Sequence, residues 1–284
     1  MAALPPYTTS FERIWHYAFR VICGLILFFL IMPILVIIPL SFNAGDYFTF
    51  TKEMLALDPA GYSLQWYQDF FTNPNWQGAV RNSVIISIFS TLIATTLGTL
   101  AALGLSQAQM PAKSAIMALL LSPMIVPLII SAAGMYFFYS RVGLQGTLIG
   151  VILAHAALGT PFVVITVTAT LVGFDLSLIR AALGLGASPF TVLRRVIVPI
   201  ILPGVVSGAL FAFITSFDEV VVVLFVGSFE QRTIPWQMFS GIREHISPTI
   251  LAVATVLVGV SIVLLTVLEL LRRRSERLRG VASN

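Results

Sequence analysis

The chain is 284 residues long, 58% of them hydrophobic and only 10% charged, with a mean hydropathy of +0.97. A soluble domain carries about a quarter charged residues, so this composition excludes a soluble globular domain and indicates an integral membrane protein. The net charge of +4 is explained by arginines beside the membrane, and no nucleic acid is expected as a partner. The single cysteine, Cys23, lies in an apolar run, which excludes a disulfide and a cysteine metal site.

Six apolar segments reach the roughly 20 helical residues that cross a bilayer core. They are residues 18–42, 83–106, 113–139, 146–172, 197–217 and 248–271. The first is too long for the apolar region of a signal peptide, so we expect it to remain as a span. The predicted fold class is an all-α integral membrane protein with six transmembrane helices. A cytoplasmic N-terminal segment (1–17) precedes a single transmembrane domain (18–284), which ends in a cytoplasmic tail (272–284).

The distribution of lysine and arginine orients these spans. With the N-terminus inside, eleven of the 16 basic residues fall in cytoplasmic parts of the chain. These are Arg13, Arg20, Lys113, Arg180, Arg194, Arg195, Arg272, Arg273, Arg274, Arg277 and Arg279, against Lys52, Arg81, Arg141, Arg232 and Arg243 outside. Both termini are therefore predicted to be cytoplasmic, together with the connection between the fourth and fifth spans.

The first outer loop, residues 43–82, is acidic and aromatic, and two explanations for its aromatic residues stay open: partner contact or an aromatic belt at the bilayer edge. The run 62–67 predicts a short interfacial helix with Ser63 as its cap. Two pairs of glycines four residues apart, Gly146/Gly150 and Gly204/Gly208, indicate close approach of helices.

The connection at residues 176–196 is more ordered than a simple linker needs to be. Asp175 or Ser177 is placed to cap a short helix, and Gly186 is a natural C′ residue to end it. Ala181 and Ala182 leave this helix with a bare patch that another protein can approach closely. The pattern predicts a docking surface on the membrane face.

A second short helix follows in the same connection. Ser188 caps it and Pro189 occupies the favoured first position. Phe190, Leu193 and Ile197 then recur at helical spacing, which gives this helix one apolar side.

The segment resembles the "EAA" loop of ABC importer permeases, the inner-membrane components of binding-protein-dependent transport. The family pattern is Glu-Ala-Ala, three residues, Gly and, about nine residues on, a hydrophobic residue with Pro. Ala181, Ala182, Gly186 and Pro199 fall in register, Ala187–Ser188 also matches, and Arg180 stands where the family usually has Glu. The resemblance implies that Arg180, Ala181, Ala182, Gly186, Ala187 and Ser188 couple the chain to an ATPase. The alternative is a loop whose arginines only obey the positive-inside rule.

Asp218 and Glu219 interrupt the apolar run that begins with the fifth span. They lie between Phe217 and the apolar residues 220–226. Two adjacent acids near membrane depth are costly unless they face water, a partner or a cation. The fifth span is therefore the one candidate broken helix that we identify from the sequence.

Over nearly its whole length the chain is similar to the polyamine (spermidine/putrescine) branch, to the second of its two permease subunits. There a Ser-x-Asp-[Asp/Glu]-Val-Val-Val stretch ends the fifth helix beside the translocation path. The resemblance implies that Asp218 and Glu219 attract an extended polycation, with Phe217, Tyr136 and Trp236 as candidates for cation–π contacts. Alternatively the acids are structural, capping a helix or pairing with an arginine of the partner subunit. Related branches leave an amino-acid derivative, an opine, iron or sulfate open as the solute.

The resemblance also implies a type I ABC importer permease (MetI-like) fold in the bacterial inner membrane. The expected partners are a second homologous permease, two ATP-binding ABC subunits, a periplasmic solute-binding protein and membrane lipid. The arginine-rich tail would bind anionic lipid headgroups. Both a hetero-pair and a homodimeric pore remain open.

The sequence lacks the phosphate loop Gly-x4-Gly-Lys-[Ser/Thr], so the chain is not expected to be an enzyme, and ATP hydrolysis is expected in a separate subunit. His16, His155 and His245 lie far apart without metal-ligand spacing, so neither a metal nor another cofactor is expected. His155, inside a span, is interpreted as a hydrogen-bonding group between helices. A gradient-driven secondary transporter that uses Asp218 and Glu219 is the alternative of another class. It predicts inverted internal symmetry, which the sequence does not display.

Overall fold

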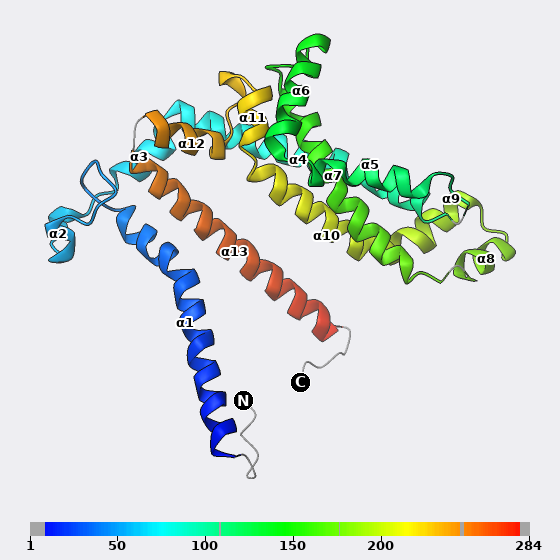
Figure 1. Cartoon of the computed structure of the whole chain (residues 1–284), viewed down its shortest axis with the longest axis horizontal. Coiled ribbons are helices and arrows are strands. Elements are labelled where there is room, and N and C mark those ends of the chain that lie inside the picture. Colours follow the sequence, from blue (N-terminus) through cyan, green and yellow to red (C-terminus); the bar gives the residue numbers. More distant parts are fainter. Residues whose placement is uncertain (1–8, 108, 176, 245–246, 279–284) are drawn as a thin grey trace. The chain divides into compact units, whose positions relative to one another are not determined.

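The computed structural model describes residues 9–107, 109–175, 177–244 and 247–278. Within these ranges the chain is helical, and the only β-pairing is an isolated bridge between Asn43 and Tyr62 (Figure 1). The chain divides into two compact units, Met1–Asn73 with Glu244–Asn284, and Pro74–Arg243. The predicted coupling and pathway residues all belong to the second unit.

The first unit contains the N-terminal helix α1 (Ser10–Leu40), which begins well before the predicted start of the first span at residue 18. The Thr9 side chain accepts a hydrogen bond from the Glu12 N–H while the Glu12 carboxylate accepts one from the Thr9 N–H, which fixes where α1 begins. Of the residues of α1, only Leu40 is buried, and large apolar side chains are exposed along most of its length. This is the pattern of a helix whose surroundings are themselves apolar.

The segment that follows α1, predicted as the first outer loop, folds around Asn43. The Asn43 side-chain amide donates to the carbonyls of Tyr47 and Thr49, and the indole N–H of Trp66 donates to the Asn43 carbonyl at 2.7 Å. The loop forms α2 (Lys52–Leu55), a 3-10 turn η1 (Pro59–Gly61) and α3 (Gln65–Thr72). The predicted short helix is present as α3 but begins at Gln65, with Leu64 as its N-cap. The predicted cap Ser63 therefore precedes the cap position, and its hydroxyl accepts a hydrogen bond from the Gln65 N–H.

The last helix, α13 (Thr249–Leu278), packs against α3 and α1 in the same unit, and the Thr249 hydroxyl donates to the Asp69 carboxylate at 2.8 Å. The arginines between residues 272 and 277 lie on its final turns, whereas Arg279 and the rest of the predicted tail lie outside the described residues. Lipid binding by the tail stays a prediction.

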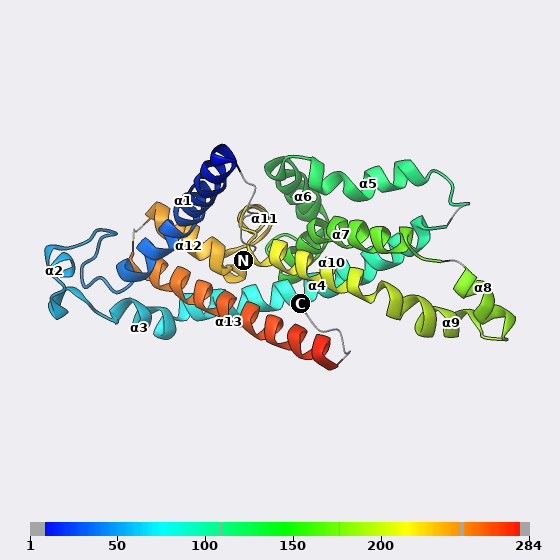
Figure 2. The same cartoon turned by 90° about the horizontal axis from the view of Figure 1, so that it is seen from below.

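The second unit is built on three long helices that run side by side (Figures 1 and 2). They are α4 (Pro74–Leu105), α7 (Leu148–Val172) and α10 (Val198–Phe217). Small residues line the contact: a Cβ added to Gly159 would lie 3.0 Å from the Cβ of Ala212 and 3.4 Å from that of Ala94. A Cβ added to Gly208 would lie 2.8 Å from the Cα of Val163. The close helix approach predicted from Gly204/Gly208 is therefore confirmed.

The corresponding prediction from Gly146/Gly150 is wrong. Gly146 has a left-handed backbone conformation, with φ +67, in the turn before α7, and its N–H donates to the carbonyl of Val226 at 2.8 Å. The Gly150 N–H donates to the hydroxyl of Thr147, the N-cap of α7. This pair shapes the entry into α7 because of its backbone conformation, and no helix crosses there.

The third predicted span, 113–139, is not one straight helix. It consists of α5 (Lys113–Ile125) and α6 (Leu128–Val142), which meet at 103°. Pro127 forces the preceding Val126 into an extended conformation, with ψ 133°, which an α-helix cannot continue through. From the sequence, a break was predicted only in the fifth span, and the break in the third span was not predicted.

Four described helices are long and apolar enough to cross a membrane: α1, α4, α7 and the continuous helix Pro189–Phe217. The bent pair α5–α6 makes a fifth if it counts as one span. The described apolar part of α13, Thr249–Val263, is shorter. The sixth span and the cytoplasmic position of both termini therefore stay predictions.

Candidate functional site

Residues 177–192 form a helical arm at the end of α7 and α10 that lies away from α11 (Figures 1 and 2). Its first helix is α8 (Ser177–Gly184). The Asp175 carboxylate accepts a hydrogen bond from the Ser177 N–H at 2.8 Å, so Asp175 is the cap of the two predicted alternatives. Leu176, between them, lies outside the described residues.

The same contacts act on the charge of Asp175. Hydrogen bonds from Ser177 hold the pKa of the Asp175 carboxyl below its usual value, and the positive charge of Arg180 adds to this in the same direction. Asp175 therefore stays ionised at neutral pH and complements the N-terminus of α8.

The C-terminus of α8 has the full hydrogen-bonding pattern of a Schellman motif. Gly186 has φ +81, its N–H donates to the Leu183 carbonyl, and the Ala187 N–H donates to the Ala182 carbonyl at 3.1 Å. The prediction that Gly186 is the C′ residue is confirmed. A residue with a Cβ is disfavoured at this φ, which explains the need for glycine.

The second helix of the arm, α9 (Pro189–Val192), begins as predicted. The Ser188 hydroxyl accepts a hydrogen bond from the Thr191 N–H, and Pro189 occupies the first helical position. Because Ser188 and Pro189 both favour a helix start, α9 begins directly after the Schellman motif. α8 folds back onto α9 and onto the turn that follows it.

The second helix of the arm, α9, continues into the fifth span as one helix, Pro189–Phe217, whereas the fifth span was predicted to begin at residue 197. A π-helical turn, η2 (Leu193–Ile197), joins α9 to α10, and the Val198 N–H donates to the Leu193 carbonyl. Pro199 has no N–H, and its ring would collide with the Arg195 carbonyl in a regular α-helix; the wider turn relieves this collision.

The arm leaves apolar side chains uncovered. Leu185 is 90% exposed and Phe190 is 70% exposed, whereas Val192 is 2% exposed. The predicted coupling residues lie around them: Arg180, Ala181, Gly186 and Ser188 are exposed, and Ala182 and Ala187 are half-buried. The structure thus brings the six predicted coupling residues together on one small surface.

At its other end the continuous helix stops at Phe217, and a short helix, α11 (Val221–Val226), follows. The predicted break at Asp218 and Glu219 is confirmed, but the two acids differ. The Asp218 side chain is exposed, with neither a hydrogen bond nor an ion pair to any described residue. Glu219 is 8% exposed, and its carboxylate accepts a hydrogen bond from the Val222 N–H at 2.9 Å. Of the two structural alternatives, helix capping therefore describes Glu219 and does not describe Asp218, whereas pairing with an arginine of the partner subunit stays a prediction.

A buried cluster of hydroxyl and imidazole groups holds the end of α10. The Ser216 hydroxyl accepts a hydrogen bond from the Ser90 hydroxyl of α4 at 2.8 Å and lies 2.9 Å from Nδ1 of His155 in α7. All three residues are at most 3% exposed. The interpretation of His155 as a hydrogen-bonding group between helices is confirmed.

The segment after α11 is also tied to α4. The Asn82 amide donates to the carbonyls of Glu230 and Arg232, and the Ser83 hydroxyl accepts a hydrogen bond from the Ile234 N–H at 2.8 Å. These contacts fix the turn η3 (Phe229–Gln231) and the start of α12 (Ile234–Glu244). The break is thus anchored to α4 on both of its sides.

The three aromatic residues predicted for cation–π contacts have different surroundings. Phe217 stacks on Phe213, with ring centroids 5.8 Å apart. The Trp236 ring already faces a cation, the guanidinium of Arg232, whose Cζ lies 5.0 Å from the ring centroid. Among the described residues, none of the three predicted rings stacks on another, so they do not form one aromatic box.

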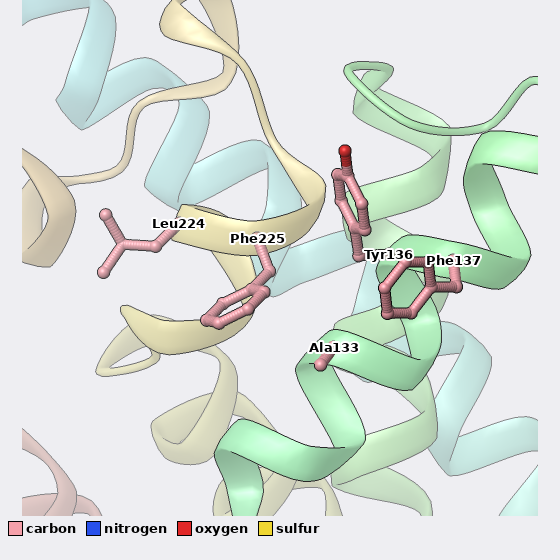
Figure 3. Close-up of a pocket in the computed structure, with 5 residues that line it drawn as sticks. All are labelled: Ala133, Tyr136, Phe137, Leu224 and Phe225. Atoms are coloured by element: carbon pink, nitrogen blue, oxygen red, sulfur yellow. The ribbon is translucent and has the colours of Figure 1, made fainter.

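Tyr136 lines a pocket of about 370 Å³ between α6 and α11 (Figure 3). The lining residues are Ala133, Tyr136, Phe137, Leu224 and Phe225. Figure 3 shows Ala133, Tyr136 and Phe137 on α6, and Leu224 and Phe225 on α11. Sequence reasoning missed Phe137 and Phe225. The sequence signal for Phe137 is its helical spacing from Ala133 after Pro127, which breaks the helix.

The chain is similar in sequence to known transport proteins. The chain matches the family "Binding-protein-dependent transport system inner membrane component" over residues 94–279. The spermidine/putrescine transport system permease protein PotC of Haemophilus influenzae is 33% identical over 247 residues, which cover 87% of this chain and 93% of the relative. The putrescine transport system permease protein PotI of Escherichia coli is 28% identical over 238 residues, 81% of this chain and 82% of the relative.

Among solved structures, the chain resembles one from the crystal structure of a bacterial ABC transporter involved in the import of the acidic polysaccharide alginate. The TM-score is 0.70 over 93% of this chain and 99% of that chain, at 16% sequence identity, a likeness that shows the fold alone. The all-helical permease fold predicted from the sequence is confirmed. Because the family match covers most of the chain and the resemblance to PotC extends over nearly all of it, the chain belongs to the family of binding-protein-dependent transport system inner membrane components.

Proposed function

We propose that this chain is the permease subunit of an ATP-driven ABC importer for a polyamine or a similar small cationic organic solute. It forms the translocation pathway with a second homologous permease. Two ATP-binding subunits bind the arm from the cytoplasm, and a periplasmic solute-binding protein delivers the solute to the outer loops. Membership of a transport permease family argues against an enzyme and against a stand-alone secondary transporter.

The observation that carries this proposal is the bare apolar surface of the arm. Leu185 and Phe190 are mostly exposed on a connection that the arginine distribution assigns to the cytoplasm. Apolar side chains that face water on an otherwise ordered element mark a protein–protein contact. Capping at Asp175 and the left-handed Gly186 order the arm before any partner binds, which reduces the entropy cost of docking.

The continuous helix supports a mechanical role for the arm. The helix Pro189–Phe217 has 29 residues, which at about 1.5 Å per residue corresponds to roughly 44 Å. The arm lies at one end and Asp218 follows the other end. Movement of the ATP-binding subunits against the arm would therefore displace the end of α10 directly. ATP shifts the equilibrium between inward-open and outward-open states because the ATP-binding subunits that hold it contact the arm differently in the two states.

The solute class rests on the relatives and on Asp218. PotC and PotI are named for spermidine and putrescine transport. An exposed carboxylate without an intramolecular partner, at the end of a membrane helix, is available to a cation, either the solute or an arginine of the partner subunit. Glu219 is already engaged in capping α11, so we assign solute contact to Asp218 alone of the two acids.

The proposal is tested by reconstituting this chain in proteoliposomes with its companion permease, the ATP-binding subunit and the binding protein. We expect uptake of labelled putrescine or spermidine that requires ATP on the side of the arm and is lost when any one component is omitted. Uptake by this chain alone, driven by an ion gradient, would contradict the permease assignment. ATP-dependent uptake of an anionic or neutral solute without polyamine uptake would contradict the solute class.

A further inference from the structure

The buried contact among Ser90, His155 and Ser216 lies two residues before the exposed Asp218. Ser216 is the second-last residue of α10. Its hydroxyl forms hydrogen bonds with residues of two neighbouring helices, Ser90 of α4 and His155 of α7. Elsewhere along the same helices the contact is made by small apolar groups such as Gly159 and Ala212. The polar contact is therefore placed where α10 ends, beside the break.

Small residues let helix backbones approach closely, and an apolar contact of this kind imposes no directional constraint on the donor and acceptor groups of the two helices. A hydrogen bond does impose such a constraint, since the donor and the acceptor must stay aligned. The Ser90–Ser216 and His155–Ser216 contacts fix the axial position and the rotation of the last turn of α10. Asp218 follows this turn directly, and its N–H donates to the Ile214 carbonyl, so it is held in register with the same turn.

The second ring nitrogen of His155 is unusual. Nε2 is buried and has no hydrogen-bond partner among the described residues, in a side chain that is 1% exposed. An unpartnered buried nitrogen lowers stability, so an apolar side chain of similar size would be more favourable if packing were the only demand. The histidine is explained by its other nitrogen, Nδ1, which holds Ser216.

We propose that His155 is a positioning residue for the translocation pathway, which through Ser216 sets where the Asp218 carboxylate emerges from α10. This inference rests on the proposed function, in which Asp218 contacts a cationic solute. Nδ1 of His155 and the Ser216 hydroxyl lie 2.9 Å apart, and the tautomer of the ring sets which of the two donates. Loss of this contact leaves Asp218 charged and exposed, but no longer held in one position.

The test uses the complete transporter in proteoliposomes, with labelled putrescine, and compares three variants of one position. His155→Asn keeps a polar atom bonded to Cγ, where the histidine carries Nδ1. His155→Gln places its amide farther out, near Nε2, and His155→Leu removes both polar atoms. We expect His155→Gln and His155→Leu to raise the KM for uptake about threefold to tenfold, the range for one hydrogen bond between membrane helices. His155→Asn is expected to recover most of that loss.

Two further variants separate positioning from general stability. Ser216→Ala breaks the same contact from the other side, and it is expected to raise the KM as His155→Leu does. Ser87→Ala is the matched control, because the buried Ser87 hydroxyl donates only to the Ser83 carbonyl of its own helix. Its KM is expected to stay at the wild-type value. If His155→Leu fails to assemble, the KM values of His155→Asn and His155→Gln still test the inference, because only the Asn variant keeps a polar atom at the position of Nδ1.

A double-mutant cycle with Asp218→Asn shows whether His155 acts through Asp218. We expect His155→Leu to raise the KM in the wild-type background and to have no further effect in the Asp218→Asn background. Equal KM effects in both backgrounds, or a fall in assembled transporter with no change in KM, would overturn the inference while leaving the proposed function intact. If Asp218→Asn alone does not change polyamine uptake, the solute assignment fails, and this inference fails with it.

Discussion

The two ends of the helix Pro189–Phe217 are built in opposite ways. At the arm, order comes from the local backbone: a cap at Asp175, a left-handed Gly186 and a cap at Ser188, with Leu185 left exposed. At the break, order comes from distant parts of the chain, through buried side-chain hydrogen bonds from α4 and α7. A surface that is locally ordered but uncovered is suited to a partner, whereas the break depends on its own helix bundle.

The largest effect is expected from a substitution that disrupts the backbone of the arm and leaves the packing of α4, α7 and α10 unchanged. In Gly186→Val, a β-branched residue must adopt φ near +81, which costs about 1–2 kcal/mol for the backbone alone. Since about 1.4 kcal/mol corresponds to a factor of ten, we expect ATP-dependent uptake to fall roughly tenfold or more. Membrane insertion is expected to be normal, because no contact of the bundle changes. Uptake and membrane extraction measured on the same preparation check both.

The control for this substitution is Gly184→Ala, at the last residue of α8. Nothing lies within 4 Å of a Cβ added there, and Gly184 has no left-handed φ. Uptake is expected to be unchanged or slightly improved, because alanine favours the helix. Equal damage from both substitutions would show that the left-handed turn is not what matters.

A smaller effect is expected when the apolar surface of the arm is removed. Leu185 is 90% exposed, so Leu185→Ser should change the stability of the permease by less than about 0.5 kcal/mol. If an ATP-binding subunit covers Leu185, its affinity should fall by up to about tenfold, in line with about 1.5 kcal/mol for a buried leucine. Co-purification over a titration of the ATP-binding subunit measures this. The same loss in Val172→Ser, which is 84% exposed but outside the arm, would refute a specific contact.

The smallest effects distinguish the two acids at the break. Asp218→Asn removes a charge that has no partner among the described residues, so it should raise the KM for polyamine about threefold to tenfold, as expected for the net contribution of a single solvent-exposed hydrogen bond. Glu219→Gln keeps an oxygen that can accept the Val222 N–H, so it should change the KM by less than about twofold. Kinetics of labelled putrescine uptake give both values. A larger effect at Glu219 than at Asp218 would reverse our assignment.

The local structure of the arm was predictable from the sequence because its signals are short-range. Gly186, Ser188 and Pro189 each favour one backbone conformation, and all three adopt it. Asp218 and Glu219 likewise marked the break, because adjacent acids interrupt an apolar run visibly.

What could not be predicted depends on packing between distant segments. The different surroundings of Asp218 and Glu219 arise from how α11 begins, and the Ser90–Ser216 contact joins residues 126 positions apart. The bend at Pro127 was overlooked because hydropathy is continuous across it. Trp236 is typical of a cation-binding residue by type, but only the fold reveals that Arg232 already faces its ring.

The most direct test of the account is the accessibility of the arm in the assembled transporter. A single thiol at Leu185→Cys, in a Cys23→Ser background, is labelled with a membrane-impermeant maleimide from either side, with and without the ATP-binding subunits. The account predicts labelling from the cytoplasmic side in the permease alone and protection in the full assembly. Labelling from the periplasmic side, or equal labelling with and without the ATP-binding subunits, would contradict it.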